Sequence, residues 1–262
     1  TSSFETDIRM YKEDIAVSVA YSKMLEKIQL ISKSENENII KGLSEILQEI
    51  ESDKFKWNHD LEDIHLNIEE TLYKKIGDTA GKLHFGRSRN DQVATDVRLF
   101  FKNKIELVRN GLIAFLEEII SLSDKNKTII MPGYTHLQKG QPVLLSQYLM
   151  AYFTMLSRDL ERIDQCLENL DILPLGSGAF AGVTIPIDRE FLAKELGFSR
   201  ISSNSIDSVS SRDHILDVHY VCSSTMLNIS REKTYFFELS NESIEIANPE
   251  DWWVCEKLLN RK

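Results

Sequence analysis

Hydrophobic residues recur at spacings of three and four along most of the chain, which is the pattern of a helix with one buried face. Long helices are therefore expected over residues 8–28, 39–50, 61–76, 93–122, 145–170 and 215–229, and a short one from Asp188 to Gly197. Short polar turns separate them, and strand-like alternation is missing. The sequence thus predicts an all-α protein.

The ends of several helices carry recognisable signals. Ser34 and Glu37 are spaced as a capping box, in which each side chain bonds the other residue's backbone N–H. Gly77 is expected to close the helix over 61–76, and Pro142 to occupy the first turn of the helix over 145–170. Over residues 93–122 and 145–170, spacings of three and four residues between hydrophobic positions alternate through many turns. This alternation predicts the seam of a long-helix bundle.

The pattern suggests a division into domains. A small helical N-terminal domain is expected over residues 1–86, and a central, partial long-helix bundle over 87–231. Residues 232–262 form a divergent tail whose hydrophobic residues keep no steady period and which Pro249 interrupts.

Composition narrows the function classes. Of 262 residues, 42% are hydrophobic, which is enough for a sizeable core, and the net charge of −10 argues against a nucleic-acid partner. Cys166, Cys222 and Cys255 are too widely spaced for a zinc site or a disulfide framework, so a reduced cytoplasmic compartment is expected. The most apolar window, 143–156, is too short to cross a membrane.

The polar segment Gly133–Pro142 lies between two of the longest helical patterns. It contains Thr135, His136 and Gln138, and such a turn can expose reactive groups without disturbing a core. His136 is the first candidate for an acid/base residue. The alternative is an ordinary loop histidine.

A second polar segment, Gly81–Gln92, precedes the helix over 93–122. Arg87, Ser88, Arg89 and Asn90 lie at the helix start, where free N–H groups and the positive dipole end favour anions. This arrangement predicts a site for carboxylates or phosphates, although a solvated basic helix start has the same sequence.

Two further features have simpler interpretations. Asp63 and His65 are expected in a solvated first helical turn rather than in a site. The glycine-rich segment Leu173–Gly182 follows no strand and precedes no Gly-Lys-Ser/Thr sequence, so a packed hairpin between helices is expected rather than a phosphate-binding loop.

Together the two polar segments offer His136 as acid or base, Thr135 and Asn90 as hydrogen-bond donors, and Arg89 as an anion clamp. This set suits proton abstraction next to a carboxylate, followed by loss of a leaving group. The sequence shows neither a metal-ligand cluster nor a nucleotide-binding loop, so no metal and no cofactor are expected.

Residues Ala80–Val93 and Pro132–Gln138 resemble the argininosuccinate lyase family, part of the fumarase/aspartase superfamily that includes the δ-crystallins. The resemblance extends over residues 1–231. Its other matching segments are Ser2-Ser3 with Asp7, Asp63-Ile64-His65, Leu173–Gly182 and Asn204–Asp213.

The resemblance implies an aspartase/fumarase-like fold that assembles into a homotetramer, with sites drawn from several subunits. It implies cofactor-free cleavage of argininosuccinate to fumarate and arginine by β-elimination, in arginine biosynthesis or the urea cycle. His136 would be the acid/base residue, and Thr135 a carboxylate contact from another subunit. The remaining substrate-site residues would be Ser3, Asp63, Ser88, Arg89, Asn90 and Gln138.

One family signature is missing from the 262 residues. The family carries a Gly-Ser-Ser loop followed by Met-Pro-Gln-Lys, which supplies a serine base and a substrate-binding lysine, and no such run occurs here. Two hypotheses follow. The chain is a truncated lyase that is inactive alone, or it is a non-catalytic, crystallin-like structural relative.

Overall fold

The computed structural model describes residues 3–230 and divides into two compact units. Unit 1 contains the residues up to Lys102 together with Leu170–Arg212, and unit 2 contains Asn103–Asn169 together with the chain from Asp213. The domain boundaries expected at residues 86 and 231 remain a prediction. The expected tail, 232–262, and Cys255 lie outside the described residues.

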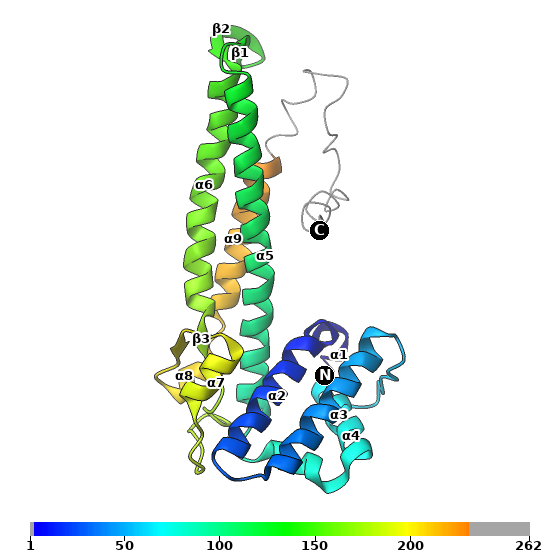
Figure 1. The fold of residues 1–262 in the computed structure, drawn as a ribbon. Coiled ribbons are helices and arrows are strands. Elements are labelled where there is room, and N and C mark those ends of the chain that lie inside the picture. Colours follow the sequence, from blue (N-terminus) through cyan, green and yellow to red (C-terminus); the bar gives the residue numbers. More distant parts are fainter. Residues whose placement is uncertain (1–2, 231–262) are drawn as a thin grey trace. The chain divides into compact units, whose positions relative to one another are not determined.

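Unit 1 is built mainly from helices, as the hydrophobic spacing predicts (Figure 1). Its large core cluster joins buried side chains of α2, α3 and α4 to those around α7. A short parallel pair, β3 with β4, aligns Ile172 with Arg200 and Leu173 with Ile201. The elements of unit 1 are α1 (Phe4–Asp7), η1 (Ile8–Met10), α2 (Tyr11–Lys27), α3 (Lys33–Glu51), α4 (Ile64–Ile76), η2 (Gly77–His84), the first part of α5, β3 (Ile172–Leu173), α7 (Arg189–Leu196), β4 (Arg200–Ile201) and α8 (Ser205–Ser210).

Most helix ends follow the predicted signals, and the capping box of α3 needs a correction. Asp188 caps α7 by accepting from the N–H of Phe191, and α7 and α4 end at Gly197 and Gly77, both at positive φ. The capping box expected at Ser34 is wrong by two residues. Ser32 and Glu35 form it instead, because α3 already begins at Lys33 and leaves Ser34 inside its first turn.

Unit 2 contains the long helices that the heptad-like spacing predicts (Figure 1). They are α5 (Arg89–Lys125), whose part from Asn103 belongs here, α6 (Leu145–Leu170) and α9 (Asp213–Ser230). Nε of Arg109 on α5 donates to a carboxylate oxygen of Asp164 on α6 at 2.5 Å. The buried Asp159 of α6 accepts from Ser224 and Asn228 of α9, which joins the third helix to the pair.

The segment expected to be a polar turn is a β-hairpin of β1 (Ile130–Thr135) and β2 (Gln138–Leu144). The position expected for Pro142, in a first helical turn, is therefore wrong, because Pro142 lies in β2 opposite Pro132. His136 and Leu137 form the tight turn with φ of 51° and 60°. Two positive φ angles define the turn type that matches the twist of a hairpin, but glycine and asparagine are its usual residues.

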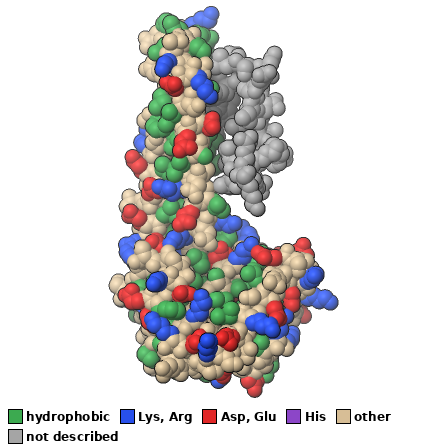
Figure 2. All heavy atoms as spheres, in the orientation of Figure 1, with side chains coloured by type: hydrophobic (Ala, Val, Ile, Leu, Met, Phe, Trp, Pro, Cys, Tyr) green, Lys and Arg blue, Asp and Glu red, His purple; other side chains and the backbone are tan. Residues whose placement is uncertain are grey.

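The surface of the described residues carries charged side chains of both signs, with hydrophobic ones between them on the face drawn in Figure 2. Among residues 3–230, every helix is too short or too polar to cross a membrane.

The turn of the hairpin should be strained at Leu137. This side chain is 90% exposed and makes little packing, while its left-handed backbone costs about 1–2 kcal/mol for a residue with a Cβ. Leu137→Gly is therefore expected to stabilise the chain by about 0.5–1 kcal/mol in urea denaturation, after allowance for the greater freedom of glycine in the unfolded state.

Leu216→Gly is the matched control, because Leu216 is also exposed but lies inside α9, where glycine should destabilise. A loss of stability in both variants would show that the turn at Leu137 is not strained.

Candidate active site

Two hydrogen bonds of Ser88 fix the start of α5. The hydroxyl of Ser88 accepts from the N–H of Asn90 at 3.3 Å, and the carboxylate of Asp91 accepts from the N–H of Ser88 at 2.9 Å. The bond from Ser88 to Asp91 is half of a capping box, but the hydroxyl of Ser88 accepts from Asn90 rather than from Asp91. This arrangement leaves Asn90 exposed and Ser88 half-buried at the helix N-terminus.

The two arginines at this helix start turn into unit 1. The Arg87 side chain is fully buried, donates to the hydroxyl of Ser18 at 3.0 Å and stacks over the ring of Tyr21. Arg89 pairs with Asp63 at 3.3 Å and with Glu69 at 3.1 Å. Carboxylates of α4 and its cap therefore balance charges that oppose the dipole of α5.

This pairing bears on the anion clamp expected at Arg89. Its guanidinium uses two N–H groups on Glu69 and a third contact on Asp63, so the charge is largely neutralised within the unit. Asp63 is itself held as the N-cap of α4, where it accepts from Leu66 at 2.7 Å. In this arrangement Arg89 and Asp63 orient each other beneath the exposed Asn90. Their role toward a substrate stays a prediction.

The other expected site residues lie at two further places. Thr135, His136 and Gln138 are exposed on the hairpin of unit 2. Ser3 is exposed at the start of α1 in unit 1, where its hydroxyl donates to Asp7. Within unit 1 the structure thus brings together Asp63, Ser88, Arg89 and Asn90, while the residues of the hairpin form a second group.

The expectation of a solvated first turn at Asp63 and His65 is wrong. Asp63 is 7% exposed and His65 is fully buried, because His65 shares the inward face of α4 with Ile68 and Leu72. The spacing of three and seven residues from His65 to these positions is the signal that predicts its burial.

His65 belongs to a buried polar cluster that sequence reasoning missed. Its Nδ1 lies 2.8 Å from Asp14 of α2 and 3.6 Å from Asp96 of α5. Gln92 donates to Asp14 and accepts from Arg89, which connects the cluster to the helix start described above. Three helices of unit 1 are thereby joined by side-chain hydrogen bonds beneath Asn90.

The protonation of this cluster follows from its burial. Burial alone lowers the pKa of His65, but the charge and hydrogen bond of Asp14 and the charge of Asp96 outweigh it and raise the pKa to about 9. Burial raises the pKa of Asp96 well above its usual range, and the charge of Asp14 adds to this effect. Burial also opposes ionisation of Asp14, but His65 and Arg87 hold its pKa low.

Asp14, His65 and Asp96 are also spaced as three metal ligands could be. Nδ1 of His65 already bonds Asp14, and its Nε2 has no hydrogen-bond partner among the described residues. A metal-bound histidine normally donates its second ring N–H to a supporting group. The geometry therefore fits a buried ion pair better than a metal site.

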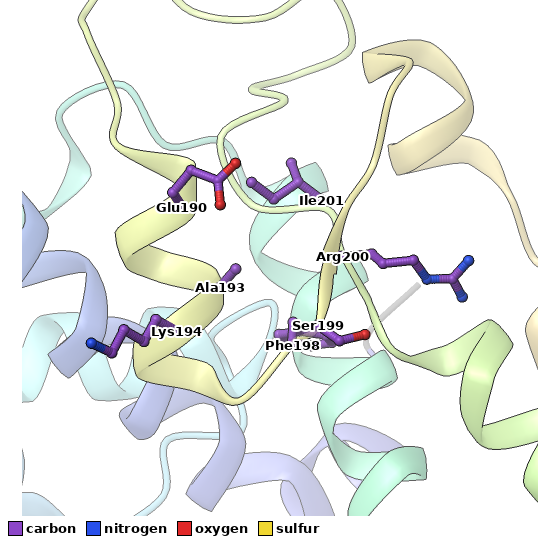
Figure 3. Close-up of a pocket in the computed structure, with 7 residues that line it drawn as sticks. All are labelled: Glu190, Ala193, Lys194, Phe198, Ser199, Arg200 and Ile201. Atoms are coloured by element: carbon purple, nitrogen blue, oxygen red, sulfur yellow. The ribbon is translucent and has the colours of Figure 1, made fainter.

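An open groove of about 570 Å³ lies elsewhere in unit 1, beside α7 and β4 (Figure 3). Charged Glu190, Lys194 and Arg200 line it together with Phe198 and Ile201. It contains none of the predicted site residues, so it is not the predicted active site.

A family model described as lyase matches residues 1–234, and the chain belongs to this family. The family resemblance and the all-α fold expected from the sequence are thus confirmed.

The chain is similar to argininosuccinate lyases in particular. It is 50% identical over 230 residues to that of Moorella thermoacetica, covering 88% of this chain and 50% of the relative. It is 47% identical over 231 residues to the argininosuccinate lyase of Acinetobacter baylyi, covering 88% of this chain and 48% of that relative. The chain spans about half the length of these curated relatives.

Solved structures of EDDS lyase have the same fold. A variant with bound fumarate matches with a TM-score of 0.79 and 28% identity, covering 86% of this chain and 44% of that one. EDDS lyase in complex with formate matches with a TM-score of 0.80 and 27% identity, covering 89% of this chain and 46% of that one.

The buried ion pair predicts how stability depends on pH. Because the folded pKa of His65 lies near 9, above the unfolded value of about 6.5, the stabilisation is complete below pH 6.5 and is lost as pH rises through 9. The free energy of unfolding from urea titrations should therefore fall between these pH values, by at most about 3 kcal/mol.

His65→Gln should reduce this fall, because glutamine does not titrate, while the raised pKa of Asp96 still contributes a loss of stability with rising pH. His219→Gln, at an exposed position of α9, should keep it. An equal pH dependence in wild type and His65→Gln would contradict the assigned ion pair.

Proposed function

We propose that this chain is part of an argininosuccinate lyase, a carbon–nitrogen lyase that splits L-argininosuccinate into fumarate and L-arginine. The observation that carries the proposal is the hairpin turn, where the exposed His136 has a φ of 51°. Glycine and asparagine are the usual residues of such a turn, so a histidine held there is a candidate functional residue. The family and the similarity to argininosuccinate lyases support the same activity.

The proposed reaction is a β-elimination. A base removes the proton from the carbon next to one succinyl carboxylate, and the electron pair is held as a carbanion stabilised by that carboxylate. The pair then forms the double bond of fumarate as the carbon–nitrogen bond breaks, and arginine leaves with a proton from a general acid. An imidazole suits such proton transfers near neutral pH, which is the role proposed for His136.

The other predicted residues take binding roles in this proposal. The hydroxyl groups of Ser88 and Thr135 and the amide of Asn90 can donate hydrogen bonds to carboxylate oxygens, where negative charge develops. Ser3 and Gln138 are further proposed substrate contacts. Asp63 and Arg89 are proposed to support Asn90 from within unit 1, in line with their mutual ion pair.

We further propose that each complete site combines several copies of the chain in a homotetramer. The family resemblance implies that Thr135 reaches the substrate carboxylate from another subunit, which supports this arrangement. Exposed apolar side chains on the long helices, among them Leu107, Ile120 and Leu216, suit contacts with other copies.

The 262 residues contain neither the serine base nor the lysine that the family resemblance implies. We therefore propose that the chain alone binds substrate without turning it over. A cytoplasmic setting belongs to the same proposal and is supported by the free thiols of Cys166 and Cys222.

Binding to the chain alone gives the first test. Argininosuccinate at about 100 times its Kd should raise the midpoint of thermal unfolding by roughly 5 °C or more, because only the folded chain binds it. Asn90→Ala should lose this protection, since it removes the proposed amide contact. The same samples should release no fumarate, measured by its ultraviolet absorbance.

Asn126→Ala is the control, because the side-chain amide of Asn126 donates to the carbonyl oxygen of Leu122, just after the last residue of α5, and the variant should keep the protection. Absence of protection in wild type by both argininosuccinate and fumarate would contradict the proposed function. Fumarate release that His136→Ala abolishes would instead show that the chain carries a complete catalytic set.

A further inference from the structure

The glycine-rich segment Leu173–Gly182 has no part in the proposed reaction, yet it is tied to the start of α5. The N–H groups of Gly176 and Gly178 both donate to one oxygen of Asp91, at 3.0 and 2.9 Å. The other oxygen of Asp91 accepts from Ser88. A fully buried carboxylate therefore accepts three backbone hydrogen bonds from two separate segments.

The backbone of the segment is shaped for this contact. Gly176 and Gly178 have φ of 91° and 63°, which side chains with a Cβ rarely adopt. A Cβ on Gly178 would also come within 2.7 Å of the carbonyl oxygen of Gly182. The glycines thus allow two N–H groups to converge on one carboxylate oxygen.

Arg189 holds the same segment from its carbonyl side. Its guanidinium donates to the carbonyl oxygens of Leu173 and Leu175 at 3.1 and 2.9 Å. The side chain also packs on Gly176, where a Cβ would lie 2.9 Å from its Cγ. Arg189 thus donates to the carbonyl groups of the segment, and Asp91 accepts from its N–H groups. Held from both sides, the segment has little freedom to shift.

The fixed segment in turn bonds a proposed substrate residue. The amide nitrogen of Asn90 donates to the carbonyl oxygen of Ala179 at 2.8 Å, although Asn90 is exposed. This bond determines which way the amide of Asn90 points. The position of the Ala179 carbonyl depends on Gly178, the neighbouring residue that Asp91 holds.

We propose that Asp91 is a positioning residue of the substrate site: it holds Gly176 and Gly178, which places the Ala179 carbonyl and so orients the amide of Asn90 toward substrate. The inference rests on the proposed function, because it requires that Asn90 contacts the substrate. Asp91 itself is buried and acts through Gly176 and Gly178 rather than on the substrate.

The test replaces the acceptor while keeping its shape. In Asp91→Asn the new NH₂ group must face an N–H of either Ser88 or the glycines, so one set of bonds is lost. We expect the Kd for argininosuccinate, measured by calorimetry, to rise at least tenfold. Amide hydrogen exchange at Gly176 and Gly178 should accelerate at least tenfold as well.

Two further variants separate positioning from stability. Gly178→Ala should also weaken binding at least tenfold, because it displaces the segment and leaves every charged group in place. Ser22→Ala removes a buried hydrogen bond of 2.6 Å to Asn36, in α2 and α3 of the same unit. It should lower stability and leave the Kd unchanged.

The outcomes are distinguishable. Tenfold weaker binding in Asp91→Asn and Gly178→Ala, but not in Ser22→Ala, supports the inference. If wild type binds argininosuccinate and Asp91→Asn binds it equally well, or Ser22→Ala loses as much affinity, this inference alone is overturned. If wild type binds neither argininosuccinate nor fumarate, the proposed function is overturned and the inference with it.

Discussion

The neutralisation of two arginines at the N-terminus of α5 is the constraint on which unit 1 depends. Arg87 and Arg89 lie where the helix dipole is already positive, and the Arg87 side chain has no exposure to water. Burial of a guanidinium is tolerable only with carboxylates or other acceptors beside it. Glu69 and Asp63 supply the carboxylates, and Ser18 supplies a hydroxyl oxygen.

These contacts explain why α2, α4 and α5 must come together in one way. Glu69 can reach both arginines only when α4 lies against the start of α5, and Gln92 connects Arg89 to Asp14 on α2. Hydrophobic packing alone would tolerate small sliding movements between helices. A buried network of charges tolerates them poorly, because each displaced partner leaves an unpaired group. The exposed Asn90 therefore stands on a rigid support.

Much of the fold could be predicted from the sequence, since helices with one apolar face leave a strong periodic signal. The hairpin could not, because none of its strand residues is buried, so no buried face imposes a hydrophobic alternation on the sequence. The ion pair of His65 and Asp14 was hidden for another reason. Charged residues near a helix start are usually solvated, and only the spacing from His65 to Ile68 and Leu72 indicates its burial. The candidate site residues were predicted from chemistry and resemblance, but their partners depend on three-dimensional contacts between distant segments.

The paired prolines of the hairpin have a consequence for self-association. In a two-stranded ribbon each strand has one side without a neighbouring strand among the described residues, and such edges can recruit strands from other molecules. Pro132 and Pro142 lie opposite each other and lack backbone N–H groups, so neither strand presents a continuous row of donors. The ribbon can therefore stay exposed with a reduced tendency to seed β-aggregates.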